Sequence, residues 1–136
     1  SVIAQLGPPD MRTPIALAIN WPERRVTPTA RLDLIKIGAL TFEPVDADRF
    51  PGPGLAKNAL RRGGSAPAIL NAANEIAVAA FLAKRIGFLD ISRVVAQTLA
   101  EADRRGLIRA TQSLDDVLAA DAEGRDLAQM VIATLH

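Results

Sequence analysis

Residues 70–82 read LNAANEIAVAAFL, and this stretch is apolar on almost every side when it is drawn as a helix. A helix of this kind is typical of the centre of a helical bundle. Its exceptions are Asn71, Asn74 and Glu75, whose spacing of i, i+3 and i+4 places them on one face. That face predicts a structural hydrogen-bonded cluster or a contact with a neighbouring loop or domain, and contact with a ligand is the alternative.

Capping signals around this stretch divide residues 55–136 into four or five helices. The helices expected from these signals cover residues 55–62, 65–85, 91–105, 113 onward and 121–135. Asp90 is the expected N-cap of the third, and Ser113 with Asp116 has the pattern of a capping box. Asp121 is the expected cap of the last helix.

The first 44 residues show a different pattern. Val2–Leu6, Leu34–Ile37 and Ala39–Phe42 are short, apolar and bounded by glycine or proline, which predicts strands. Thr13 is the expected N-cap of a short helix that ends near Asn20. This part is therefore expected to be a small α+β region.

A loop rich in proline and glycine, residues 45–54, gives the best domain boundary. The fold class expected is mainly α, with residues 1–44 as a small α+β part, residues 45–54 as a linker and residues 55–136 as a helical bundle.

Composition excludes several classes of function. The 136 residues are 49% hydrophobic and carry a formal net charge of +1, so no nucleic-acid or membrane partner is expected. The absence of cysteine excludes disulfides and thiolate sites and fits a reducing, cytoplasmic compartment. The chain opens inside an apolar run at Ser1, which suggests a portion of a longer protein.

Residues with catalytic or metal-binding potential are few. There is no glycine-rich dinucleotide fingerprint and no phosphate loop. The single histidine, His136, is terminal, and Asp46 with Asp48 offers too few oxygens for calcium. No catalytic residue and no metal ligand is therefore expected in this chain.

Four segments, in this order and spacing, closely resemble the family of 1-deoxy-D-xylulose 5-phosphate reductoisomerases. They are LGPPDMRTPIA (6–16), ALTFEPVDADRFP (39–51), LNAANEIAVAAFL (70–82) and SLDDVLAAD (113–121). The resemblance implies an enzyme that converts this substrate to 2-C-methyl-D-erythritol 4-phosphate in isoprenoid-precursor synthesis. It also implies NADPH, a divalent metal (magnesium or manganese) and a homodimer of three-part subunits.

Within the family pattern, this chain resembles the end of the catalytic domain followed by the whole C-terminal bundle. The family's proline and methionine beside the nicotinamide match Pro9 and Met11, which would form an apolar wall of the cofactor site. The family's metal ligands, cofactor fingerprint and flap have no counterpart after Ser1. We therefore expect the remaining domains of the enzyme as partners and no activity from this chain alone. The alternative is a stand-alone helical interaction module.

Overall fold

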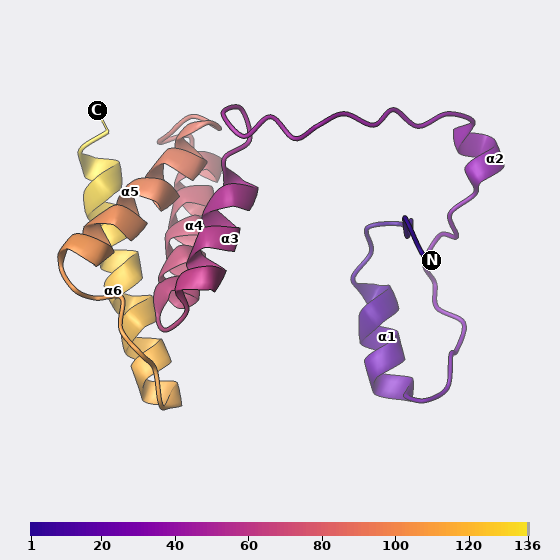
Figure 1. The fold of residues 1–136 in the computed structure, drawn as a ribbon, viewed down its shortest axis with the longest axis horizontal. Helices are drawn as coiled ribbons and strands as arrows, with labels where there is room; N and C mark the ends of the chain where they lie inside the picture. The colour runs from indigo at the N-terminus through magenta and orange to yellow at the C-terminus, as the bar shows by residue number, and fades with distance from the viewer. Residues whose placement is uncertain (136) are drawn as a thin grey trace. The chain divides into compact units, whose positions relative to one another are not determined.

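The computed structural model describes residues 1–135, so the prediction made for His136 lies outside the described part of the chain. The chain forms two compact units, Ser1–Glu43 and Pro44–His136. Six helices and no strand occur in residues 1–135 (Figure 1). The helices are α1 (Arg12–Asn20), α2 (Leu34–Ile37), α3 (Gly52–Arg62), α4 (Ala66–Leu82), α5 (Asp90–Arg104) and α6 (Leu114–Ala133). The mainly α class is confirmed.

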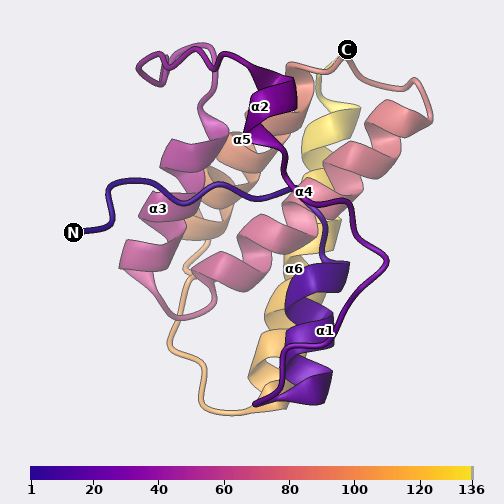
Figure 2. The same ribbon diagram turned by 90° about the vertical axis from the view of Figure 1, so that its right-hand side faces the viewer.

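The second unit is a bundle built around α4. This helix contacts α3, α5 and α6, and Figure 2 shows the same four helices from a second side. Alanine dominates its buried positions: Ala66, Ile69, Ala72, Ala73, Ala77 and Ala80. Small side chains let neighbouring helices approach closely, so the central position expected for residues 70–82 is confirmed.

Backbone geometry explains where α4 and α5 end. Arg85 N–H donates to the carbonyl of Ala80 at 2.9 Å, and Lys84 takes the left-handed conformation with φ of 59°. This is the glycine-type Schellman ending, and it stops α4 at Leu82, earlier than residue 85. The end of α5 repeats the pattern with Gly106 in the left-handed position.

Two capping predictions differ in outcome. The Ser113–Asp116 capping box at the start of α6 is confirmed, with both reciprocal hydrogen bonds present. Asp121 does not cap a separate helix, because α6 continues through it and its carboxylate accepts from Arg125 Nε at 2.6 Å. Asp90 is the first residue of α5 and not its N-cap, although its side chain accepts from the backbone of Gly87.

The strands predicted in the first unit are wrong. Leu34–Ile37 forms α2, because the side chain of Asp33 accepts from two backbone N–H groups at its start. Val2–Leu6 and Ala39–Phe42 have no regular secondary structure and no ladder partners among residues 1–135. A strand needs a neighbour for its hydrogen bonds, and the described part of the chain supplies none.

No residue of Ser1–Glu43 is buried, whereas the second unit holds the two apolar cores. Among residues 1–135, no helix combines the length and the apolar character that a membrane crossing requires.

Candidate functional site

The resemblance places the candidate site at Pro9 and Met11, which lie in a turn that leads into α1. Asp10 N–H donates to the carbonyl of Pro8 at 2.8 Å, so Pro9 is the central residue of a three-residue turn. The ring of proline fixes φ near the value that this turn requires. Met11 follows in the right-handed helical region, with φ of −64° and ψ of −17°, as the N-cap of α1.

An ion pair spans this turn. The Asp10 carboxylate accepts from Arg12 Nε at 3.0 Å and from Arg12 Nη2 at 2.6 Å. The same carboxylate accepts from the backbone N–H of Arg12, the first residue of α1, at 3.0 Å. The prediction that Thr13 is the N-cap is wrong, because α1 begins one residue before it and Met11 is the N-cap. Arg12 thereby lowers the pKa of Asp10 to about 2.

Met11 presents a soft apolar side chain on this turn. It is 70% exposed. A thioether next to a rigid proline can lie against a planar ring and keep water from it. These two residues therefore fit an apolar wall for a nicotinamide, which is what the resemblance implies.

The polar face of α4 is a hydrogen-bonded cluster. Asn71 Nδ2 donates to Glu75 Oε1 at 3.0 Å, and Arg125 of α6 donates to Glu75 Oε2 at 2.7 Å. Arg125 also pairs with Asp121, so its guanidinium joins two carboxylates and ties α6 to α4. Arg125, with Asn71, lowers the pKa of Glu75. The exposed Asn74 lies outside these bonds.

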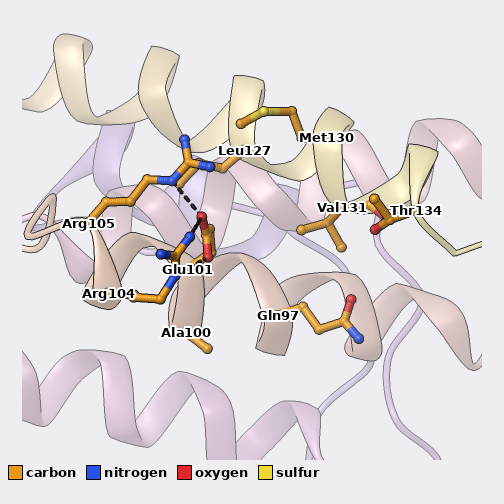
Figure 3. A pocket seen from close by; sticks show the side chains of 9 residues that line it. All are labelled: Gln97, Ala100, Glu101, Arg104, Arg105, Leu127, Met130, Val131 and Thr134. Atoms are coloured by element: carbon orange, nitrogen blue, oxygen red, sulfur yellow. Dashed lines mark hydrogen bonds and ion pairs between the residues drawn. The ribbon is translucent and has the colours of Figure 1, made fainter.

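A groove of about 570 Å³ runs between α5 and α6 (Figure 3). Apolar side chains, Leu127, Met130 and Val131, line its α6 side. On the α5 side, Glu101 accepts from Arg104 and from Arg105, and these two arginines lower its pKa to about 2. The groove contains neither residue of the candidate nicotinamide wall.

Metal-binding groups are not gathered in the described residues. No set of three or more histidine, aspartate or glutamate side chains lies together in residues 1–135. Asp46 is a turn residue, because its Oδ1 accepts from the backbone N–H groups of Asp48 and Arg49 at 3.0 Å. The described residues therefore do not fit a magnesium or manganese site.

Sequence reasoning missed two parts of this arrangement. The pairing of Asp10 with Arg12 had a signal, an acid and a base on either side of the methionine. The pairing of Glu75 with Arg125 joins residues 50 positions apart and had no local signal.

Fold and site together define a helical-bundle domain that is preceded by an exposed segment with an apolar turn. Residues 6–127 match the family model of the DXP reductoisomerase C-terminal domain. The chain belongs to this family.

Curated relatives carry the same name, 1-deoxy-D-xylulose 5-phosphate reductoisomerase. The protein of Rhodospirillum centenum is 58% identical over 98% of this chain, and that of Caulobacter vibrioides is 52% identical over 98%. The matches cover 32% and 34% of those proteins, so the chain spans about a third of their length.

Solved structures agree. The reductoisomerase from Zymomonas mobilis in complex with NADPH matches 99% of this chain and 35% of its own, with a TM-score of 0.78 and 48% identity. A DOX-P reductoisomerase in complex with NADPH, fosmidomycin and magnesium matches 99% of this chain and 34% of its own, with a TM-score of 0.77 and 40% identity.

Proposed function

We propose that this chain forms the C-terminal part of an NADPH-dependent reductoisomerase. The reaction is conversion of 1-deoxy-D-xylulose 5-phosphate to 2-C-methyl-D-erythritol 4-phosphate in the non-mevalonate synthesis of isoprenoid precursors. The observation that carries the proposal is the 58% identity, across 98% of the chain, to a relative of that name. In this proposal residues 1–44 end the catalytic domain, residues 45–54 form the linker and residues 55–136 form the supporting bundle. The last three residues of this linker already belong to α3, which begins at Gly52 and not at residue 55.

Pro9 and Met11 contribute one wall of the active site in this proposal. When NADPH is bound, its nicotinamide supplies the hydride. The side chains of Pro9 and Met11 limit the positions that the ring can take and exclude water from that side. Support comes from the exposed thioether on a hydrogen-bonded turn.

In this proposal catalytic groups and metal ligands come from other domains of the enzyme, since the chain spans about a third of the length of its relatives. We also propose that the whole enzyme uses a divalent metal, is a homodimer and acts in the cytoplasm. The chain's lack of cysteine is compatible with a reducing compartment.

The experiment compares two proteins in one assay with NADPH, manganese and substrate. The first is this chain alone. The second is a chimera, the Rhodospirillum centenum enzyme with its matching third replaced by this chain. We expect substrate-dependent NADPH oxidation from the chimera and none from the chain alone. A folded but inactive chimera, or an active isolated chain, would contradict the proposal.

If the chain were instead a stand-alone helical interaction module, the whole chain would be expected to bury its own apolar surface. The first unit exposes Ile3, Trp21, Val26, Ile35 and Phe42 among other large apolar side chains. This exposure supports the assembly of the chain with further domains.

A further inference from the structure

Asp10 and Arg12 hold the backbone on both sides of Met11. The guanidinium of Arg12 donates to both oxygens of the Asp10 carboxylate, with N–O distances of 2.6–3.1 Å. The Arg12 backbone N–H donates to the same carboxylate at 3.0 Å. These bonds connect residue 10 to residue 12 and therefore close a small ring that contains the backbone of Met11.

The segments on either side of this ring are also fixed. Upstream, the hydrogen bond from Asp10 to the carbonyl of Pro8 encloses Pro9. Downstream, Ile15 N–H donates to the carbonyl of Met11 at 3.2 Å and begins the bonding of α1. The backbone of Met11 is therefore held on both sides while its side chain stays open to the solvent.

We propose that Asp10 and Arg12 are positioning residues, whose ion pair sets the direction in which Met11 meets the nicotinamide ring. The inference rests on the proposed function of this turn. Asp10 and Arg12 act through Met11, and the wall that Met11 forms depends on their bonds.

The physical reason lies in the flexibility of methionine. Its side chain has three rotatable bonds and adapts to many shapes, so a fixed backbone is needed to define the point and the Cα–Cβ direction from which it extends. Hydride transfer requires close alignment, and a displacement of about 1 Å can cost on the order of 100-fold in rate. The two-pronged guanidinium holds a carboxylate in one orientation, which an ammonium group cannot do.

The pairing also suits a cofactor with phosphate groups. A carboxylate beside such a cofactor would repel it unless its charge were compensated, and Arg12 compensates it here. Because the pKa of Asp10 lies at about 2, the pair stays ionised at any pH at which the enzyme is assayed. The effect of the pair on NADPH use should therefore be independent of pH between about 5 and 9.

The first test observes Met11 directly. The chain contains two methionines, Met11 and Met130, so a sample labelled with ¹³C at the methionine Cα atoms gives two signals that report backbone conformation. We expect Arg12→Lys and Asp10→Asn to move the Met11 Cα signal toward the position of an unstructured methionine and to leave Met130 unchanged. Unchanged Met11 signals in both variants would overturn the inference.

The second test measures kinetics in the chimera with the Rhodospirillum centenum enzyme. We expect Arg12→Lys to lower kcat/KM for NADPH by about 10- to 100-fold and to change the KM for the substrate less than about twofold. The matched control is Arg25→Lys, because Arg25 forms a similar exposed pair with Glu23 two residues away. The inference would be overturned if Arg12→Lys left kcat/KM for NADPH unchanged. It would also be overturned if Arg12→Lys impaired the use of NADPH and the use of the substrate equally.

A Met11→Ala variant separates this inference from the proposed function. If Met11→Ala leaves NADPH kinetics unchanged in an active chimera, the wall role of Met11 and the positioning role both fail, while the proposed reaction stands. If Met11→Ala weakens NADPH use but Asp10→Asn and Arg12→Lys do not, only the positioning role is wrong.

Discussion

Lys84 and Gly106 occupy the same left-handed position at the ends of two neighbouring helices, with φ of 59° and 69°. Each helix closes with the same pair of backbone hydrogen bonds. Only glycine takes this conformation without a steric cost from Cβ. Gly106 therefore suits its position at the end of α5, whereas Lys84 is strained at the end of α4.

Lys84→Gly should raise the free energy of unfolding by about 0.5–1 kcal/mol, because it removes the steric cost while the unfolded chain gains some entropy. Gly106→Ala should lower it by about 1 kcal/mol. Urea unfolding followed by circular dichroism measures both. A loss of stability in Lys84→Gly would mean that the aliphatic part of the lysine contributes more than its backbone costs.

At the scale of elements, the contact between α4 and α6 depends on Gly124. A Cβ at this position would lie 3.1 Å from the Cβ of Ala72 and 3.1 Å from the Cα of Ile69. Both neighbours are rigid, since one is an alanine and the other is backbone. The two helices can therefore approach this closely only because residue 124 lacks a side chain.

Gly124→Ala should lower the free energy of unfolding by about 1–2 kcal/mol, although alanine favours helix by about 1 kcal/mol. Ala122→Gly, at an exposed position in the same helix, is the control. Its free energy of unfolding should fall by about 1 kcal/mol from the lower helix propensity of glycine alone. Thermal unfolding of both variants tests this. A more stable Gly124→Ala protein would show that α6 can move away from α4 at no cost.

The cluster of Asn71, Glu75 and Arg125 should make the α4–α6 contact sensitive to acid. The folded-state pKa of Glu75 lies below its ordinary value of 4.5, because Arg125 and Asn71 bond to the ionised form. A lowered pKa contributes stability above pH 4.5, and that contribution disappears as the pH falls through the folded-state value.

Glu75→Gln should therefore be less stable than the parent chain at pH 7, and the difference should shrink steadily below pH 4.5. Gln129→Ala, an exposed change in α6, serves as the control and should keep a constant difference, because neither side chain titrates. Urea midpoints from pH 3 to 7 give the comparison. A difference between Glu75→Gln and the parent that does not depend on pH would contradict the assigned role of Glu75.

Local signals in the sequence were sufficient for much of the bundle. The Ser113–Asp116 box depends on residues three apart, and it was predictable for that reason. The prediction that Asp121 caps a helix was wrong because aspartate serves both as a helix cap and as the partner of an arginine four residues later. The strands at Val2–Leu6 and Ala39–Phe42 were wrong because strand pairing depends on distant partners that local patterns do not reveal.

At the scale of the whole molecule, burial is uneven. The second unit contains both apolar cores, and the first unit contains no buried residue. Apolar burial is the main source of stability, so the backbone amides of the two units should differ greatly in their protection from hydrogen exchange.

Hydrogen–deuterium exchange of the chain alone should be much faster in residues 1–43 than in α4, α5 and α6. In the chimera, residues 1–43 should become protected, because other domains cover their apolar side chains. Equal protection of residues 1–43 in both proteins would favour the stand-alone module.

The central claim is that Pro9 and Met11 form a wall beside the nicotinamide. A crystal structure of the chimera with NADPH bound tests it most directly. We predict that the Met11 side chain lies within about 4.5 Å of the nicotinamide ring, with Asp10 and Arg12 still paired. A nicotinamide ring in contact with neither Pro9 nor Met11 would contradict the claim.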